Sequence, residues 1–325
     1  MSKDKMCNTR YYFRDIVKKL GMESMPVSFG AEKRCFIFKD FVIFATPVES
    51  KDKQNISDLL LTRLVKQQNA EYLKSCGINT PEIVDIQFEN DNIFEIQQRA
   101  PGSVLGFSNQ ANAISCLLGK DYPVHSIAYI ESETKNILGN KILNYHIKMQ
   151  KLLKNAELKQ IAKFVKDFWD IEKFGLDLDV HLENFLYDKE KGFYFIDLPS
   201  VQSSQEKMFS IEKLDSGEYC ASKQSGQVKE FKHVELKTVV FQICNLIKGY
   251  EKFCMLFGDN PKTKVVEANC SAIISRIFLA LEKSNIAIDK KDLESLKQMF
   301  LENNDLQKDF FKKDWPAERI LILFF

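Results

Sequence analysis

Hydrophobic residues in the first hundred positions form two kinds of pattern. β-branched and aromatic residues dominate from 26 to 48, with turn signals inside the stretch, and this composition fits two or three antiparallel strands. Apolar residues then recur every three or four positions from Ile56 until Gly77 stops the pattern, which predicts one long helix. The predicted elements of this part are a short helix, strands, a long helix and a strand pair, at 8–22, 26–48, 56–76, 83–88 and 93–97.

In the remainder of the chain, the helical period dominates. Gly175 ends an amphipathic stretch, and a strand, a tight turn and a second strand are expected after it. Residues 200–232 are polar and show no sustained period, so a long loop is expected there. The predicted elements are helices at 142–153, 158–174, 234–249, 265–283 and 293–301, with strands at 179–186 and 193–197.

The order of these elements, strands first and helices afterwards, limits the fold class. Rossmann and TIM-barrel architectures alternate strand and helix along the whole chain, and this sequence does not. We therefore predict an α+β fold with two lobes. The β-rich N-lobe is expected over residues 1–100 and the mainly helical C-lobe over 101–325.

Bulk composition is that of a folded soluble protein. The chain has 325 residues, of which 45% are hydrophobic and 28% charged. No apolar run approaches the roughly 20 residues that span a bilayer. No apolar segment follows the charged residues after Met1, so no Sec-type signal peptide is expected. A cytoplasmic location is the expectation, and delivery into a host cell by a route that needs no signal peptide stays open.

The cysteine spacing and the net charge indicate which metal sites, disulfides and electrostatic partners can be expected. The eight cysteines are scattered, and none forms a C-x-x-C pair. This spacing predicts free, mostly buried thiols rather than a zinc site or a disulfide framework. The net charge is +1, so an electrostatic partner would have to be attracted by a local patch.

One such local excess of charge lies between residues 141 and 166, where seven lysines face a single glutamate. A solvated helix surface is the simpler interpretation. The alternative is a docking patch for an anionic ligand such as an acidic lipid headgroup, an inositol polyphosphate or RNA. The lysines of this candidate patch are Lys148, Lys151, Lys154, Lys159 and Lys163.

The segment most informative about chemistry is 179–197. Asp179 is followed five residues later by Asn184, and Asp197 closes a short apolar strand. Phosphoryl transfer from ATP uses such a set. One carboxylate accepts or orients the proton of the acceptor hydroxyl, while an amide oxygen and a second carboxylate hold Mg²⁺ against the phosphates. A polar hairpin whose acids only cap turns is the alternative interpretation.

Asp179, His181 and Asn184 form a D-x-H-x-x-N loop, and the strand after it ends in Asp197. This segment resembles the protein-kinase-like superfamily, in particular the aminoglycoside phosphotransferase and choline-kinase-like branch and compact bacterial effector kinases. The resemblance implies that Asp179 is the catalytic base and that Asn184 and Asp197 bind Mg²⁺. His181 is expected to be a structural hydrogen-bonding residue, and Asp177 a turn cap.

The resemblance extends in weaker form over roughly residues 25–250. Segment 28–31 is similar to a reduced phosphate-binding loop, and segment 94–102 is similar to the hinge, whose backbone would pair with adenine. The residues to which the resemblance assigns nucleotide or metal contacts are Gly30, Gln98, Asn184 and Asp197.

Two charged residues of the superfamily pattern are absent from their expected places. Phe44 stands where a strand should present the lysine that pairs with the phosphates, and Lys39 or Lys33 could substitute. The long helix should supply the glutamate that pairs with this lysine. Spacing does not decide among the residues that the helix offers, which are Gln67, Gln68 and Glu71.

The predicted function is therefore that of an ATP- and Mg²⁺-dependent kinase that transfers the γ-phosphate to a hydroxyl group. Loop 200–232 is rich in Ser and Lys rather than in acids, which favours a protein Ser/Thr or lipid-type acceptor over a small molecule such as an aminoglycoside or choline. A pseudokinase that senses nucleotide or binds a partner is the alternative, because of Phe44 and the reduced glycine loop. The retained Asp179, Asn184 and Asp197 argue against it.

Overall fold

The fold is taken from a computed structural model of the chain. It describes residues 27–29, 34–48, 56–89, 92–107, 132–176, 178–198, 209–213, 219–223, 234–254 and 260–302. The predicted helix at 8–22, Gly30, Lys33 and Asp177 lie outside these ranges. Within them, no helix combines the length and the apolar character needed to cross a membrane.

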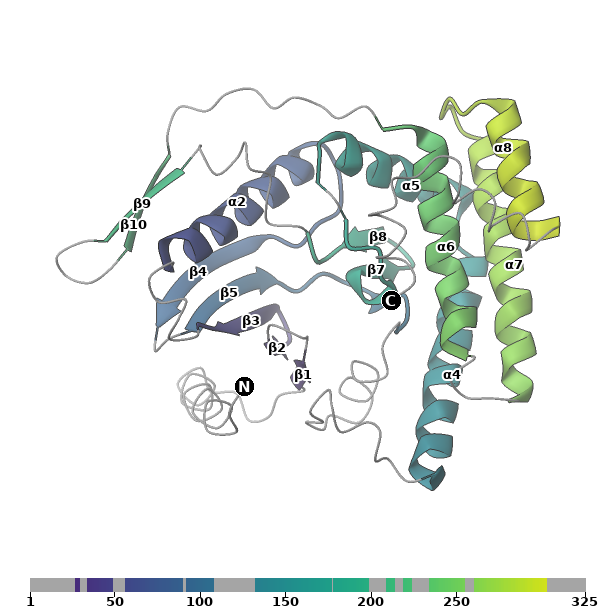
Figure 1. Ribbon diagram of the computed structural model, residues 1–325, viewed down its shortest axis with the longest axis horizontal. Coiled ribbons are helices and arrows are strands. Elements are labelled where there is room, and N and C mark those ends of the chain that lie inside the picture. Colours follow the sequence, from purple (N-terminus) through teal and green to yellow (C-terminus); the bar gives the residue numbers. More distant parts are fainter. Residues whose placement is uncertain are drawn as a thin grey trace.

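Five antiparallel strands form a sheet in the N-terminal part of the chain (Figure 1). The strand order is β1-β2-β3-β5-β4, so β5 lies between β3 and β4. The strands coincide with the β-branched and aromatic stretches, and the strand predictions are confirmed. Their bounds are β1 Val27–Phe29, β2 Arg34–Ile37, β3 Phe41–Pro47, β4 Ile83–Glu89 and β5 Asn92–Gln98.

Helix α2, Ile56–Ser75, covers one face of this sheet and confirms the long predicted helix. Its residue Leu60 is buried in a cluster with Ile93 of β5, and the helix lies beside β4 (Figure 1). After the helix, Gly77 has a φ of 80°, a left-handed conformation that glycine adopts without strain.

Alternation along β5 separates the two faces of the sheet. Ile93 packs toward α2, so Glu95 and Gln97 point to the same side. Phe94 and Ile96 point to the opposite side, where they belong to a separate apolar cluster. The face toward α2 therefore carries buried polar groups, while the opposite face is apolar.

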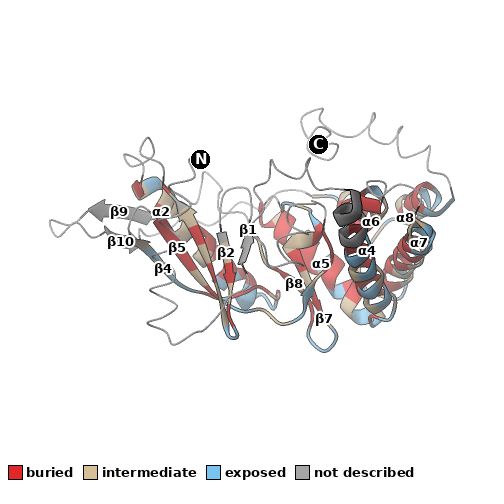
Figure 2. Ribbon diagram, turned by 90° about the horizontal axis from the view of Figure 1, so that it is seen from below, coloured by how far each residue is buried: buried red, intermediate tan, exposed pale blue. Residues whose placement is uncertain are grey.

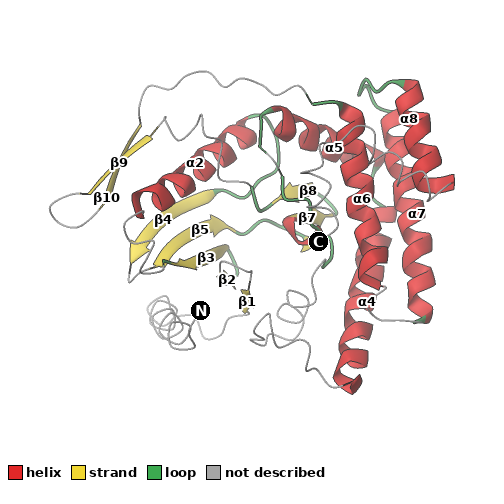
Figure 3. Cartoon of the chain, viewed as in Figure 1, coloured by secondary structure: helices red, strands yellow, loops and turns green. Residues whose placement is uncertain are grey.

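The C-terminal part is mainly helical (Figure 3). Helix α7 packs against α4, α5 and α6, and the buried sides of these helices form the large hydrophobic core (Figure 2). Asn260 caps α7 by accepting a hydrogen bond from the Lys262 N–H, and Pro261 occupies its first turn. The bounds are α4 Ser132–Lys154, α5 Leu158–Lys173, α6 Leu236–Cys254, α7 Pro261–Glu282 and α8 Lys290–Lys297.

A second sheet, in the order β6-β7-β8, lies against α5. Phe164 and Phe168 of α5 contact the rings of Phe185 on β7 and Phe195 on β8, with centroids between 5.5 and 6.2 Å apart. This aromatic cluster fixes the β7–β8 hairpin on the helical core. The bounds are β6 Ser103–Val104, β7 Phe185–Asp188 and β8 Gly192–Phe195.

The structure differs from the sequence predictions at several places. Helix α4 begins at Ser132 rather than at 142. Residues 178–181 form a loop and Leu182–Asn184 a 3₁₀ helix where a strand was predicted, because the Asn184 side chain donates to the Asp179 carbonyl and closes a local turn. The predicted loop 200–232 contains an antiparallel strand pair, and α8 continues into a π-helix. These elements are β9 Phe209–Lys213, β10 Tyr219–Lys223 and η6 Gln298–Glu302.

Candidate active site

The β7–β8 hairpin brings the two halves of the predicted metal site together. Phe185 pairs with Phe195 across the hairpin, and the Ile196 N–H donates to the Asn184 carbonyl at 3.1 Å. Asn184 therefore lies opposite Ile196, and Asp197 follows directly. Residues that are 13 positions apart in sequence become neighbours because the two strands pair.

Hydrogen bonds within the loop hold Asp179 against Asn184. The Asn184 Nδ2 group donates to the Asp179 carbonyl oxygen at 2.9 Å and to Asp179 Oδ2 at 3.0 Å. The backbone closes the same turn, since the His181 N–H donates to Asp179 O and the Asn184 N–H donates to His181 O. With Nδ2 committed to Asp179, the Oδ1 of Asn184 is the side-chain atom suited to bind a cation.

Asp179 is an exposed carboxylate that is kept ionised. His181 Nε2 lies 3.1 Å from Asp179 Oδ1, and this hydrogen bond is the main cause that lowers the pKa of Asp179. The same contact raises the pKa of His181. The Asp197 carboxylate is close enough to oppose the shift of the Asp179 pKa by repulsion. Asp179 is therefore available as a proton acceptor at neutral pH.

A buried ion pair reaches the site from the N-terminal part of the chain. Lys66 Nζ of α2 lies 2.9 Å from Glu95 Oε1 of β5 and 3.5 Å from Asp197 Oδ1. The Lys66 and Glu95 side chains are only 3% and 2% exposed. Arg63, one turn earlier on α2, also pairs with Glu95 at 3.4 Å. Gln97 donates a further hydrogen bond to Glu95 Oε1.

This ion pair differs from the sequence prediction. Phe44 is confirmed as a residue of β3, and its ring centroid lies 5.8 Å from Lys66 Nζ. The expected glutamate of the helix is not found among its three candidates: Glu71 is exposed, and Gln67 donates instead to the Ile83 carbonyl. The glutamate of the pair comes from β5. The possible substitute Lys39 is exposed in the turn between β2 and β3.

Lys66 and Glu95 were missed because each looks ordinary in its own segment. The available signal was a charged residue at an otherwise buried position of each element: Lys66 lies next to Val65 and one turn before Ala70, and Glu95 stands between Phe94 and Ile96. A buried charge requires a partner of opposite sign. Opposite charges at two such positions indicate that the two elements meet there.

Gln98 lies at the end of β5, where the hinge was expected. Its backbone N–H donates to the Glu82 carbonyl at 2.8 Å, and the Arg99 N–H donates to the Asp40 carbonyl at 2.9 Å. These two amides are already used within the sheet, so adenine would have to meet other backbone groups of this segment or displace these bonds. The role of Gln98 stays a prediction, as does that of Gly30, which the structure does not describe.

The oxygen atoms present suit a magnesium ion. Mg²⁺ binds hard oxygen ligands and keeps several waters, so it needs only one or two protein groups besides substrate phosphates. Asn184 and Asp197 supply an amide oxygen and a carboxylate at adjacent positions of the hairpin. Among the described residues, no group of three or more His, Cys, Asp or Glu side chains is placed to hold a metal ion.

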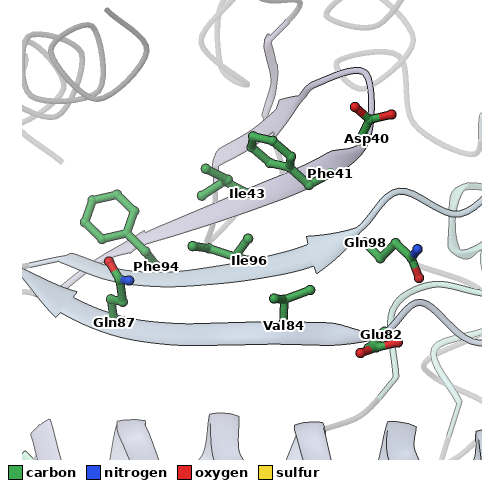
Figure 4. Close-up of a pocket in the computed structure, with 9 residues that line it drawn as sticks. All are labelled: Asp40, Phe41, Ile43, Glu82, Val84, Gln87, Phe94, Ile96 and Gln98. Atoms are coloured by element: carbon green, nitrogen blue, oxygen red, sulfur yellow. The ribbon is translucent and has the colours of Figure 1, made fainter. Parts of the chain in front are cut away.

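A cavity of about 530 Å³ lies on the other face of the sheet (Figure 4). Ile43, Phe94 and Ile96 line it, and their side chains point away from the face that α2 covers. Glu95 points to the opposite side from Phe94. The cavity is therefore separated by the sheet from the Lys66 and Asp197 side chains.

The candidate lysine patch is divided between helices. Lys154 Nζ donates to Asn269 Oδ1 on α7 at 2.9 Å. Lys163 pairs with Asp167 at 2.5 Å and also donates to the Gly77 carbonyl at 2.8 Å. Several of the lysines thus have local partners, and a single docking face is not supported. The members are Lys148, Lys151 and Lys154 on α4 and Lys159 and Lys163 on α5.

Comparisons with known proteins find similarity only among solved structures. No protein-family model and no curated protein sequence matches the chain. Aminoglycoside phosphotransferase APH(3'')-Id from Streptomyces rimosus aligns at 10% identity and a TM-score of 0.34, over 88% of this chain and 95% of that one. The kinase PK-1 of Cydia pomonella granulovirus aligns at 13% identity and 0.32, over 91% and 93%. The bifunctional kinase-methyltransferase WbdD aligns at 10% identity and 0.31, over 83% and 47%.

The order of sheets and helices along the chain gives its fold class. A five-stranded antiparallel sheet with a helix on one face precedes a mainly helical region, and the β7–β8 hairpin carries an acid, an amide and a second acid. The described residues thus form an α+β fold, in which the larger sheet precedes the helical region. Because a fold hosts many activities, the function has to be argued from the site.

Proposed function

We propose that the protein is an ATP- and Mg²⁺-dependent phosphotransferase. The observation that carries the proposal is the meeting of Asp179, Asn184 and Asp197 around one loop. Transfer of a phosphoryl group from ATP requires such a proton acceptor and oxygen ligands for a divalent ion.

Each residue of the loop has a separate role in this proposal. Asp179 accepts or orients the proton of the acceptor hydroxyl, and its hydrogen bonds to His181 and Asn184 fix its direction. Asn184 Oδ1 and the Asp197 carboxylate hold Mg²⁺. When bound, this ion offsets the negative charge of the β- and γ-phosphates. Gly30 and Gln98 are assigned to the nucleotide on the strength of the sequence pattern.

The acceptor is a hydroxyl group, and a protein Ser/Thr or a lipid-type acceptor is favoured. The Asp179 side chain is 61% exposed, so a hydroxyl carried on a large molecule can reach it. An aminoglycoside- or choline-like small molecule is the second candidate within the same reaction class. Phosphate transfer assays with protein, lipid and small-molecule acceptors separate the two.

Nucleotide binding can be tested by thermal stability. At an ATP concentration about 100-fold above Kd, the free energy of unfolding should rise by about 2.7 kcal/mol, with Mg²⁺ present and much less with a chelator. No shift with millimolar ATP, ADP or GTP would contradict the proposal. Binding without any phosphate transfer, detected by mass spectrometry, would instead identify a nucleotide-binding pseudokinase.

A further inference from the structure

The buried ion pair beside the candidate site has an unusual origin for each charge. The cation, Lys66, comes from helix α2, and the anion, Glu95, comes from strand β5. The adjacent strand β3 carries Phe44 directly opposite Glu95 in the register. The strand position at which the sequence pattern expects the phosphate-binding lysine is therefore apolar, and the Lys66 ammonium group lies 5.8 Å from the centroid of the Phe44 ring.

The need to neutralise the charge of Glu95 does not by itself explain why a lysine is buried at position 66. Arg63 already reaches Glu95 Oε2 at 3.4 Å and Gln97 donates to Oε1. A buried ion pair is also weak evidence for a stabilising role, because desolvation of both charges offsets much of their attraction. The burial of Lys66 is thus better explained by the second group that its ammonium contacts.

That second group is the carboxylate of Asp197, which is assigned to the metal. Lys66 Nζ is 3.5 Å from Asp197 Oδ1, and the Asp197 side chain is 35% exposed, so this end of the pair opens toward the site. The ammonium group therefore adjoins the carboxylate at which the proposed metal ion would receive the phosphates. Glu95, at 2.9 Å, fixes the ammonium on the other side.

We propose that Lys66 binds the phosphates of the nucleotide and that Glu95 is the positioning residue that holds its ammonium in place. In the sequence pattern, the strand supplies the lysine of this ion pair and the helix supplies the glutamate. Here the helix supplies the lysine and the sheet supplies the glutamate. This inference rests on the proposed phosphotransferase function and adds the residue that recognises the triphosphate.

The first test compares nucleotide affinities of variants in the full-length chain. Lys66→Met, and Lys66→Met combined with Glu95→Gln so that no unpaired acid remains, should lower Mg-ATP affinity about tenfold or more. Adenosine affinity should stay within about twofold, because adenosine has no phosphates. Lys74→Met is the matched control: it makes the same substitution on the same helix, at an exposed salt bridge with Glu82, and should leave ATP affinity unchanged.

A rescue variant distinguishes phosphate recognition from packing. Phe44 faces Glu95 across β3 and β5, so Phe44→Lys in the Lys66→Met background returns an ammonium to the same place from the strand. Recovery of ATP affinity is expected. If wild type binds ATP and Asp197→Ala does not, but both Lys66→Met variants bind ATP as wild type does, this inference is wrong while the proposed function stands. If wild type itself does not bind ATP, the proposed function is wrong.

Chemical labelling of the wild-type protein decides the matter even if the variants do not fold. In an acyl phosphate of ATP, a lysine amine near the terminal phosphate attacks the acyl carbon. An amide bond forms, the bond from that carbon to the phosphate oxygen breaks, and ATP and a proton leave. We expect the acyl group on Lys66, with labelling blocked by excess Mg-ATP. Labelling confined to another lysine such as Lys39, or no labelling of a protein that binds ATP, would overturn the assignment.

Discussion

The β7–β8 hairpin and the N-terminal sheet with its helix α2 match the sequence prediction to different degrees. In the hairpin, Asp179, Asn184 and Asp197 stand in the expected order and lie together. In the sheet and its helix, the two charges are exchanged between Lys66 and Glu95. The groups of a hairpin must come from one short segment. An ion pair between two elements can be supplied from either side, because Coulomb attraction does not depend on which element carries which sign.

The largest expected effect is on turnover at the hairpin. Asp179→Asn should lower kcat by about 10²- to 10⁴-fold and leave Mg-ATP binding nearly intact, because the base acts on the acceptor. Asp197→Ala should abolish Mg²⁺-supported ATP binding. Steady-state kinetics and titration calorimetry measure the two effects. Asp188→Asn, on the same hairpin at a turn-capping position, is the control. Equal loss of binding in the Asp179 and Asp197 variants would contradict the separate roles.

The close approach of Gly102 to the backbone of β7 should be sensitive to the addition of one methyl group. Gly102 has a φ of 95°, and a Cβ there would lie 2.5 Å from the Tyr187 carbonyl oxygen of β7. Gly102→Ala should lower the free energy of unfolding by about 2–5 kcal/mol, through left-handed strain and displacement of the backbone. Gly77→Ala is the matched control, since Gly77 has a φ of 80° but nothing within 4 Å of a Cβ. Its expected cost is about 1–2 kcal/mol. Equal losses in urea titrations would contradict the close approach.

A buried histidine makes the helical region sensitive to acid. His146 Nε2 accepts a hydrogen bond from the Phe107 N–H at 3.0 Å, and burial lowers the pKa of His146 to about 3. The unfolded chain binds a proton near pH 6.5 and the folded chain does not. The contribution of His146 is therefore complete above pH 6.5 and is lost as the pH falls toward 3, by about 1.4 kcal/mol per pH unit.

Substitution of His146 should remove this part of the pH dependence. Between pH 6.5 and 5, wild type should lose about 2 kcal/mol more than His146→Gln, measured by urea unfolding at both pH values. The Gln side chain retains an acceptor for the Phe107 amide. His181→Gln, at the exposed histidine, is the control: the raised pKa of His181 gives its contribution the opposite sign, so this variant should lose at least as much stability as wild type. A wild-type curve parallel to that of His146→Gln would contradict a neutral buried imidazole.

The smallest expected effect concerns the acid limb of the pH profile of kcat/KM. The His181 hydrogen bond lowers the pKa of Asp179, so in His181→Asn this pKa should rise toward its ordinary value near 3.9. The acid limb of the kcat/KM profile should then move to higher pH by less than about one unit, because Asp179 is exposed. An acid limb that moves to lower pH, or not at all, would show that His181 does not act on Asp179.

The sequence predicts the elements best where the period is long and local. The helical period of 56–76 and the strand pair predicted at 83–88 and 93–97 agree with α2, β4 and β5 to within one residue at each end. The strand pair β9–β10 was missed because alternation over only five residues disappears within a polar stretch. The true start of α4 was missed because its first ten residues are mainly polar.

In the candidate site too, contacts within one short segment could be predicted, and contacts between distant segments could not. Asp179, Asn184 and Asp197 lie within one hairpin, so the sequence order alone indicates that they meet. Lys66 and Glu95 are 29 positions apart, and they meet because α2 packs on the face of the sheet to which odd-numbered residues of β5 point. That packing depends on the twist and order of five strands, which no local pattern contains.

The most direct test of the central claim is phosphate transfer itself. The wild-type chain is incubated with Mg²⁺ and γ-labelled ATP, with and without protein, lipid and small-molecule acceptors, beside Asp179→Asn. The label is located by mass spectrometry. The account predicts covalent phosphate on a hydroxyl group in the wild-type reaction and about 10²-fold less or none with Asp179→Asn. Incorporation that is equal in the two proteins, or a wild-type protein that neither binds nor transfers the nucleotide, would contradict it.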